Sequence, residues 1–452
     1  MTDTNKKIRV RFAPSPTGML QIGNIRTALI TWLFAQHNAG YFLLRIDDTD
    51  LERSKPEYEA AIYESLTWLG MNWDELAHQS KRLDRYAVVI QQLKDAGRLY
   101  ACYETPEELA LKRKSQLSQS LPPLYDRASL KLTDEQKAKF KAEGRKPHWR
   151  FQMNPTPIEW NDLIRGEVKF DGATMSDPVL IREDGSPLYH LCSVIDDMDF
   201  GITHIVRGED HVSNTASHIQ IFEALKFTPP TFAHLPLVSD SEGKKLSKRL
   251  GALSILQLRD EVGLEPMSIC SLLARLGTSD PIEAYDKMTP LIESFDFSKF
   301  GRGTPKFDQD EMVRLNGKIL HDLDYNQVQT RLAQIGLEHV TEEFWNIVRP
   351  NLEIISDIKE WWTVANGPVT PIVADTDFAS QAISLMPPAP WTSGTWQEWT
   401  NAIKAATGRK GKDLFMPLRQ ALTGMDHGPE LGDLLPLIGP DRAKARLSKQ
   451  AA

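Results

Sequence analysis

Cysteine is scarce in this chain of 452 residues, and its three cysteines, Cys102, Cys192 and Cys270, lie far apart without a Cys-x-x-Cys pair. An odd number at this spacing argues against a disulfide framework and a four-ligand zinc site, so a reducing compartment fits best. No apolar run approaches the ~20 residues that span a bilayer, and the N-terminal MTDTNKK is polar. We therefore expect a soluble, cytoplasmic protein that has no membrane partner.

An overall positive charge is also lacking, because 53 Lys and Arg stand against 61 Asp and Glu, for a formal net charge of −8. Net charge informs on solubility more than on any particular site. Residues 401–452 differ from the rest, with nine basic and five acidic residues and a net charge of +4. A basic end is compatible with a phosphate-backbone partner and, equally, with a solvated helical surface.

Internal repeats and low-complexity tracts are absent, and the length predicts two to four packed units. Near the start, residues 8–12 (IRVRF) predict a strand that runs into the loop sequence APSPTG. Helical spacing follows over residues 25–33, with Asn24 as the expected cap and Gly40 as the stop. A second strand is predicted at residues 41–46 (YFLLRI), so this order predicts a right-handed βαβ unit of a parallel sheet.

The sheet is expected to resume only after a long insertion. Residues 188–195 and 202–206 are strand-like, and residues 215–225 have helical spacing. The preceding hundred residues are rich in Lys, Glu and Gln and contain LPPL at 121–124, which indicates an inserted subdomain between two halves of a nucleotide-binding fold. From Pro266 onward the pattern is mainly helical.

Two segments have the composition of phosphate-binding elements. Residues 14–24 form a Pro- and Gly-containing loop before a helix, where backbone N–H groups and the helix dipole favour an anion and Gly23 allows close approach. Alone, this segment is better explained as a structural turn. The second segment, KKLSKR at 244–249, follows a polar loop at 239–243. Such lysines usually form a solvated patch, but on a loop they can also clamp a polyphosphate.

Together, the two segments resemble the HIGH and KMSKS signatures of class I aminoacyl-tRNA synthetases. The surrounding motifs narrow the resemblance to glutamyl-tRNA synthetases of the bacterial type, in order and in spacing. These motifs are RFAPSPTG before the first signature, RIDDTD at 45–50, IVRGEDH at 205–211, KLSKR at 245–249 and GRKGKDLFMPLRQALTG at 408–424. The resemblance covers nearly the whole chain. It implies an α/β fold in which a Rossmann-like parallel sheet carries an inserted α/β acceptor-binding subdomain and is followed by an all-α anticodon-binding region.

The same resemblance divides the chain into five segments. They are the first half of the Rossmann-like catalytic domain (1–75), the inserted tRNA acceptor-binding subdomain (76–186), the second half (187–240), the KLSKR loop and stem-contact region (241–315), and the α-helical anticodon-binding region (316–452). The implied reaction is ATP-dependent ligation of L-glutamate to tRNA(Glu) through a glutamyl-adenylate, releasing AMP and pyrophosphate. We expect a monomer, with Mg²⁺ entering together with ATP.

Family site residues carry over where the motifs match. The implied glutamate ligands are Arg11, Ala13, Ser15, Asp47, Tyr189 and Arg207. Guanidinium groups suit carboxylates, and an acid such as Asp47 can hold the substrate ammonium, although an ordinary ion pair is the alternative for each. The implied ATP site comprises Gly23, Asn24, Asp210, His211 and Lys248. The implied catalytic residues are Gln21, Lys245 and Lys248, within two signature regions that run from Pro14 to Asn24 and from Lys245 to Arg249.

Two features depart from the family pattern. Gln21 stands where most relatives have histidine, and its neutral amide cannot carry positive charge, so slower catalysis is expected. Glu104 stands at the second ligand place after Cys102, where some relatives have a zinc cysteine. The later ligand pair is missing near Arg127 and Ala128, so we predict no zinc.

Other readings of the sequence remain open. A catalytically silent paralogue that binds tRNA or protein is favoured only by Gln21, and the KLSKR motif opposes it. A ligase that modifies a tRNA base is opposed by the C-terminal region, which those shortened relatives lack. The sequence does not decide whether tRNA(Gln) is charged besides tRNA(Glu). The alignment places Asn351 where discriminating relatives use an arginine to read the last anticodon base.

Overall fold

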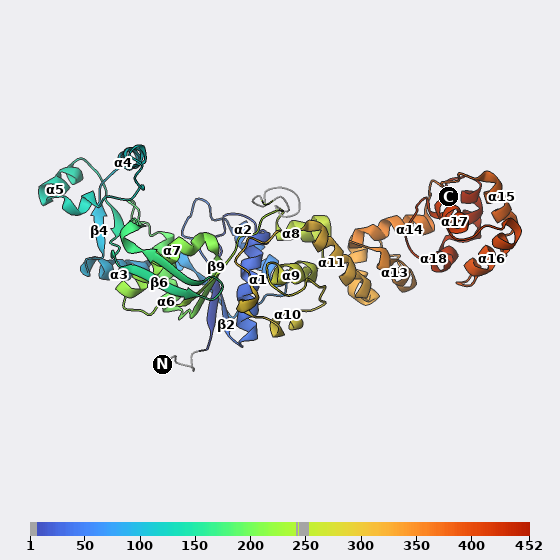
Figure 1. The fold of residues 1–452 in the computed structure, drawn as a ribbon, viewed down its shortest axis with the longest axis horizontal. Helices are drawn as coiled ribbons and strands as arrows, with labels where there is room; N and C mark the ends of the chain where they lie inside the picture. The colour runs from blue at the N-terminus through green and yellow to red at the C-terminus, as the bar shows by residue number, and fades with distance from the viewer. Residues whose placement is uncertain (1–6, 241–242, 244–252) are drawn as a thin grey trace. The chain divides into compact units, whose positions relative to one another are not determined.

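The computed structural model describes residues 7–240, 243 and 253–452 (Figure 1). The chain separates into two compact units, of which the first comprises Met1–Gln257, Leu273–Ile282 and Lys287–Asp308. The second comprises Leu258–Leu272, Glu283–Asp286 and Gln309–Ala452. Within the described residues, no helix has both the length and the apolar character needed to cross a membrane.

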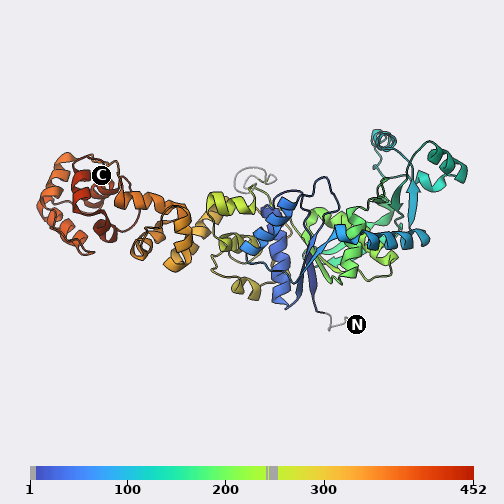
Figure 2. The same cartoon turned by 180° about the vertical axis from the view of Figure 1, so that it is seen from behind.

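The first unit begins with the predicted βαβ arrangement. Strand β1 (Arg9–Phe12) pairs in parallel with β2 (Tyr41–Ile46), and helix α1 (Ile22–His37) connects them and packs beside both (Figures 1 and 2). Strand β3 (Glu75–His78) extends the parallel sheet on the other side of β2, after helix α2 (Pro56–Trp68). The prediction of a parallel α/β sheet is therefore confirmed.

Helix α1 differs from its prediction at both ends. Its N-cap is Gln21, whose backbone is extended, so the predicted cap at Asn24 is wrong. The helix also ends at His37, before the predicted stop at Gly40. Gly40 serves a different purpose, because a Cβ there would lie 2.9 Å from the carbonyl oxygen of Ile8, where β2 begins beside the chain that leads into β1.

The sheet resumes after the insertion, but with one element of the wrong type. The strand predicted at 188–195 is helix α6 (Tyr189–Asp199), because its middle, residues 191–197, is buried on all sides, and such a run does not distinguish strand from helix. The next two predictions are confirmed as β9 (His204–Gly208) and α7 (Val212–Ala224). Strand β10 (Thr231–Leu235), which was not predicted, pairs in parallel with β9.

The two halves of the sheet meet between β1 and β9. The backbone N–H of Thr203 donates to the carbonyl of Arg9 at 2.9 Å, and the N–H of Arg9 donates to the Thr203 hydroxyl at the same distance. This contact brings the carboxyl ends of β1 and β9 to the same edge.

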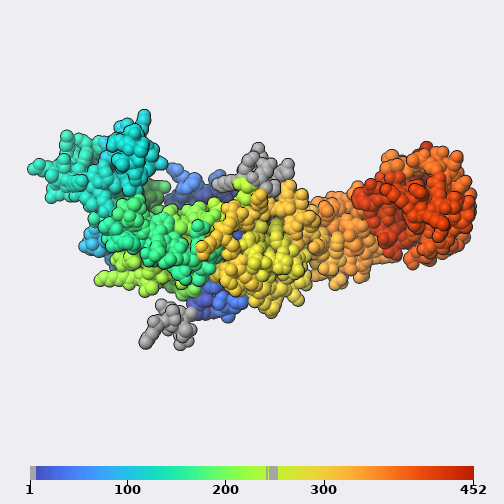
Figure 3. All heavy atoms as spheres, in the orientation of Figure 1, coloured from blue at the N-terminus to red at the C-terminus, as the bar shows by residue number. Residues whose placement is uncertain are grey.

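The insertion forms antiparallel structure of its own. Strands β4 (Leu99–Cys102), β5 (His148–Phe151) and β8 (Val179–Ile181) make a sheet, and β6 (Pro157–Asp162) pairs with β7 (Gly166–Asp171) as a hairpin. Helix α3 (Leu83–Asp95) packs against α6. Helices α4 (Pro106–Ser118) and α5 (Asp134–Ala142) have no buried residue and belong to the cyan lobe that projects from this unit in Figure 3.

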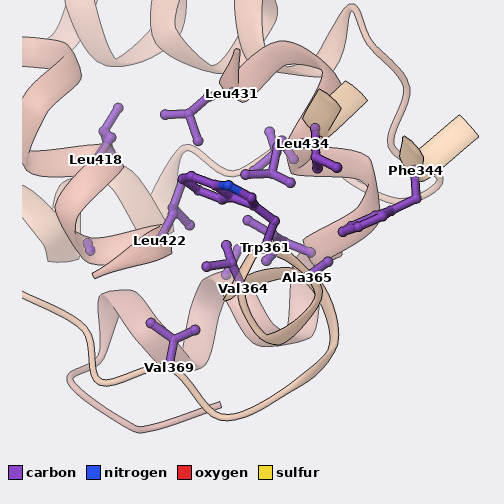
Figure 4. Close-up of a cluster of buried hydrophobic side chains, with 14 of the residues drawn as sticks. Phe344, Trp361, Val364, Ala365, Val369, Leu418, Leu422, Leu431 and Leu434 are labelled. Carbon is purple, nitrogen blue, oxygen red and sulfur yellow. The ribbon is translucent and has the colours of Figure 1, made fainter. Parts of the chain in front are cut away.

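The second unit is helical, which confirms the prediction for the C-terminal region. Its main helices are α11 (Gln309–Asp322), α12 (Tyr325–Gln334), α13 (Glu342–Val348), α14 (Ile358–Asn366), α15 (Thr376–Ser384), α16 (Thr395–Thr407), α17 (Lys412–Thr423), α18 (Leu431–Ile438) and α19 (Pro440–Leu447). Trp361 of α14 lies among Leu422, Leu431 and Leu434 in their common core (Figure 4). Gly428, with φ +123°, packs so closely that a Cβ there would lie 2.1 Å from the Trp361 ring.

Candidate functional site

A cavity of about 950 Å³ opens in the first unit at the carboxyl ends of its parallel strands. Three strand-to-loop junctions contribute to its lining, at 11–15 after β1, 207–211 after β9 and 235–239 after β10. Ligands of open α/β sheets bind at this edge. Of the predicted site residues, the cavity is lined by Arg11, Ala13, Ser15, Gln21, Gly23, Asn24, Tyr189, Arg207, Asp210 and His211.

The start of helix α1 forms one wall. Asn24 lies in the first helical turn, and its side-chain oxygen accepts a hydrogen bond from the backbone N–H of Gln21 at 3.2 Å. The space beside Gly23 is open, because nothing lies within 4 Å of a Cβ built on it. Arg26, on the next turn, donates to the main-chain carbonyls of Pro236 and Leu276 and ties the helix to the loop after β10. The wall presents backbone N–H groups and the positive end of the helix dipole to the cavity.

The floor is built from arginines that face carboxylates. Arg11 Nε donates to Asp197 Oδ1 at 3.0 Å, and Arg45 Nη1 donates to the same oxygen at 2.9 Å. Arg45 also holds both oxygens of Asp47, at 2.7 and 3.1 Å. Burial raises the pKa of Asp47 to about 6, against the lowering effect of Arg45. Arg45 lines the cavity, whereas Asp47, which it binds, is not among the lining residues.

Arg207 has a different environment. The residue is 5% exposed, and its guanidinium donates to the Tyr189 hydroxyl at 3.0 Å, the Thr215 hydroxyl at 2.6 Å and His234 Nε2 at 3.3 Å. No carboxylate of the described residues forms an ion pair with it. Burial lowers the pKa of Arg207, although a guanidinium remains charged at neutral pH. The cavity therefore contains a buried positive charge that is held only by neutral groups.

Tyr189 and His211 lie next to this charge. The Tyr189 hydroxyl lies 3.4 Å from His211 Nδ1, and the Asn214 amide nitrogen lies 3.1 Å from the same atom. Burial and the charge of Arg207 lower the pKa of His211, which favours the neutral imidazole. Asp210 lines the cavity between His211 and the end of β9. This side of the cavity offers polar neutral groups and the carboxylate of Asp210 beside the cation of Arg207.

Comparison with known proteins agrees with this geometry. Residues 7–314 match the family described as tRNA synthetases class I (E and Q), catalytic domain, and residues 338–451 match the anticodon binding domain. A glutamate-tRNA ligase of Azospirillum brasilense is 55% identical over 445 residues, covering 98% of this chain and 100% of that protein. A glutamate-tRNA ligase 1 of Maricaulis maris is 52% identical over 444 residues, covering 98% and 100%. The chain belongs to the glutamate-tRNA ligase family.

A solved structure of this family has the same fold. The glutamate tRNA ligase of Elizabethkingia meningosepticum, in complex with its amino acid, matches with a TM-score of 0.85 at 29% identity and covers 98% of this chain and 99% of that one. The match therefore includes residues of both units of this member of the glutamate-tRNA ligase family. The chain is a class I aminoacyl-tRNA synthetase in fold and family.

The second predicted signature region, from Lys245 to Arg249, lies outside the described residues. The roles expected of Lys245 and Lys248 in the synthetase reaction, and the place of Arg249 in the signature, therefore stay predictions. Ser239 and Gly243, which precede this region in the chain, line the cavity.

Cys102 and Glu104, the two residues at the expected first ligand pair, belong to a hydrogen-bonded cluster. Glu104 accepts from the hydroxyls of Tyr125 at 2.8 Å and Ser129 at 2.7 Å, and from Lys112 at 3.3 Å. Tyr125 also lies 3.5 Å from the sulfur of Cys102. Within residues 7–240, 243 and 253–452, no group of three or more His, Cys, Asp or Glu side chains is arranged to hold a metal ion.

Four residues that support the site were not predicted as site residues from the sequence. Asp197 lies on the helix mistaken for a strand, and His234 lies on the strand that was not predicted. Thr215 and Asp162 carry no motif. The pair Asp196–Asp197 within an apolar run was the one available signal, because buried carboxylates in such a run require cationic partners.

Proposed function

We propose that the enzyme ligates L-glutamate to tRNA(Glu) through a glutamyl-adenylate, with ATP as the energy source and AMP and pyrophosphate as products. The observation that carries this proposal is the cavity in which Arg207, a buried cation without a carboxylate partner, faces the same space as the N-terminus of α1. An acidic amino acid and a nucleotide phosphate are the ligands that these two walls favour. Family membership supports the same reaction.

Glutamate recognition is proposed to rest on Arg207, which binds the side-chain carboxylate, with Tyr189 beside it. Arg11, Ala13 and Ser15 would contact the rest of the amino acid from the loop after β1. Asp47 is proposed to hold the substrate ammonium, or to shape its site through Arg45. A neutral glutamine would leave the Arg207 charge unpaired, which gives a physical basis for selectivity.

ATP is proposed to bind along α1. Gly23 and Asn24 would lie against the nucleotide, Asp210 and His211 beside the adenylate, and Gln21 near the α-phosphate. Lys248, assisted by Lys245, would stabilise the charge that develops on the departing pyrophosphate. The reaction is in-line attack of the glutamate carboxylate on the α-phosphate, which needs positioning more than a general base. Mg²⁺ would arrive with ATP, and we propose no zinc.

The tRNA is proposed to bind with its acceptor end at the insertion (76–186), its stem along 241–315 and its anticodon on the helical region 316–452, which belongs to the second unit. The match of residues 338–451 to an anticodon binding domain supports the last assignment. Asn351, an exposed residue at the end of a short 3-10 helix, is proposed to replace the arginine that discriminating relatives use. A monomeric state and a cytoplasmic location complete the proposal, and both outcomes for tRNA(Gln), charged or not charged, are compatible with it.

ATP-dependent charging of purified tRNA(Glu) and tRNA(Gln) with labelled glutamate tests this function. We expect tRNA(Glu) to be charged, and the charging to be lost when the terminal adenosine is removed. Label on a tRNA without that adenosine would instead indicate base modification. If the natural protein charges neither tRNA and Gln21→His restores charging, the chain is a silent paralogue that retains the fold and site. If both forms fail, the proposed function is wrong.

A further inference from the structure

We infer that Asp162 is a positioning residue for glutamate recognition, which acts through His234 to hold the guanidinium of Arg207. Asp162 ends β6 in the insertion and lies outside every motif that identifies the family. The inference rests on the proposed role of Arg207 as the ligand of the substrate side chain. It adds a chain of hydrogen bonds, Asp162 to His234 to Arg207, which starts in the insertion and ends at the cavity.

The carboxylate of Asp162 is fixed from both sides. It is buried, and its Oδ1 accepts three backbone N–H groups, from Ile164 at 3.0 Å, Arg165 at 3.0 Å and His234 at 3.1 Å. Its Oδ2 accepts the ring Nδ1–H of His234. Burial raises the pKa of Asp162, but the hydrogen bonds outweigh this effect and lower it. The group is therefore an ionised acceptor with one possible orientation.

This contact decides which nitrogen of His234 carries the proton. Because Nδ1–H donates to Asp162, a neutral ring presents the lone pair of Nε2 to the cavity side. That atom lies 3.3 Å from Arg207 Nε and 2.8 Å from the Thr215 hydroxyl. Burial lowers the pKa of His234 against the raising effect of Asp162, and the charge of Arg207 lowers it further. His234 is thus a neutral acceptor for the guanidinium.

The imidazole of His234 separates the carboxylate of Asp162 from the guanidinium of Arg207. A carboxylate in direct contact would hold Arg207 firmly but would also neutralise it before the substrate arrives. With the imidazole between them, Asp162 orients the acceptor, while the charge of Arg207 stays available to an acidic ligand. Tyr189 from α6 and Thr215 from α7 supply the other two acceptors. Each guanidinium nitrogen then donates to one of these neutral groups, and two of the five N–H groups remain for a ligand.

Asp162→Asn breaks this chain without changing its shape. The three backbone N–H groups keep the amide oxygen facing them, so the new NH₂ must face His234 Nδ1. Nδ1 then becomes the acceptor and the proton moves to Nε2. An N–H would face the Nε–H of Arg207, and two donors in contact force the guanidinium away from its position. The substitution therefore tests tautomer and position, while size and packing are retained.

The experiment measures kinetic constants for glutamate, ATP and tRNA in the charging assay, together with thermal stability. For Asp162→Asn we expect the KM for glutamate to rise about tenfold or more, because such a rise corresponds to the loss of a charge-assisted hydrogen bond. The KM for ATP should change less than about twofold. Asp177→Asn is the matched control. Asp177 is also buried in the insertion and accepts from Tyr100, Arg127 and the backbone of Met153, none of which contacts Arg207.

A second pair of variants decides the matter if Asp162→Asn does not fold. Thr215→Val removes the hydroxyl between His234 and Arg207 at nearly constant volume, and it should raise the KM for glutamate. Thr215→Ser, which keeps the hydroxyl, should reverse most of that rise. Equal KM values for the valine and serine variants would overturn the inference.

Arg207→Ala separates the inference from the function on which it rests. If Arg207→Ala leaves the KM for glutamate unchanged, the proposed role of Arg207 fails. If Arg207→Ala raises it but Asp162→Asn behaves like Asp177→Asn, the positioning role of Asp162 is overturned and Arg207 keeps its role. The inference is supported if the KM for glutamate rises in Asp162→Asn and not in Asp177→Asn, while the KM for ATP stays nearly constant.

Discussion

Two parts of one cavity, the floor and the end of β9, hold arginine side chains in opposite ways. On the floor, Arg11 and Arg45 share the carboxylate of Asp197, and Arg45 also holds Asp47. At the end of β9, Arg207 donates hydrogen bonds only to hydroxyls and an imidazole, and its guanidinium lies 5.7 Å from the centroid of the Phe232 ring. A carboxylate partner fixes a guanidinium and cancels its charge, whereas neutral partners fix it and leave the charge free. The comparison indicates that the floor gives the site its shape and that Arg207 gives it its preference for an acidic ligand.

Neutral partners alone do not mark a binding site, as Arg446 in the second unit shows. Its guanidinium donates to the main-chain carbonyls of Val364 and Gly367, at the end of α14, and of Leu422 in α17, so it ties these two helices to α19. Arg207 differs in that it lines a cavity and donates to side chains that other residues orient. Neutral acceptors and access to a cavity are both needed for a ligand-binding role.

The largest expected effect is on stability, from Asp197→Asn. Removing the carboxylate leaves two buried guanidinium groups short of a counter-charge, which typically costs about 3–5 kcal/mol. Thermal unfolding of the purified protein measures the loss. Asp199→Asn is the control on the same helix, because its partners Arg82 and Arg85 are partly exposed and such pairs contribute about 0–1 kcal/mol. Equal melting temperatures for the two variants would contradict the structural role of the floor.

Arg207→Ala should show the opposite signature. It removes a buried charge without leaving a carboxylate unpaired, so the melting temperature should fall less than in Asp197→Asn. The KM for glutamate should rise at least tenfold, roughly the loss of one charge-assisted hydrogen bond. Steady-state charging of tRNA(Glu) measures the constant. A normal KM together with a large loss of stability would instead assign Arg207 a structural role like that of Arg11 and Arg45.

A pH profile tests whether Asp47 binds the substrate ammonium, because burial raises the pKa of this carboxyl to about 6. The carboxylate is ionised above that pH and protonated below it, so an ammonium ligand loses its partner as the pH falls. The KM for glutamate should rise about tenfold between pH 7.5 and about pH 5, as expected for a group with this pKa. In Asp47→Asn, the KM should be high at every pH and this rise should be absent. If the KM for glutamate of Asp47→Asn still rises at low pH as in the natural enzyme, another titrating group causes the rise.

The smallest expected effect belongs to Gln21, a neutral residue at the place where the resemblance to the family implies histidine. Hydrogen bonds to charged groups contribute about 1.5–3 kcal/mol and neutral ones about 1 kcal/mol, so Gln21→His should hold the charging rate or raise it by up to about tenfold. Single-turnover charging at saturating ATP measures the rate. A large loss would indicate that the Gln21 amide makes contacts which an imidazole cannot replace.

The sequence predicted the parts of the fold that carry local signals. The first βαβ unit follows from alternation, a proline-rich loop and helical spacing, and the C-terminal helices follow from periodicity. Helix α6 was predicted as a strand because residues 191–197 are buried on all sides, which removes the helical period from the sequence pattern. The chain Asp162–His234–Arg207 could not be predicted, because its members lie up to 72 residues apart and pair only in the folded state.

The selectivity between glutamate and glutamine tests the central claim most directly. The ratio of kcat/KM for the two amino acids, measured on tRNA(Glu) with the natural enzyme and with Arg207→Ala, isolates the one charge that distinguishes them. If the unpaired charge of Arg207 reads the side-chain carboxylate, the natural enzyme strongly prefers glutamate and the variant loses at least about tenfold of that preference. If Arg207→Ala weakens activity with both amino acids by the same factor and keeps their ratio, glutamate is recognised elsewhere in the cavity.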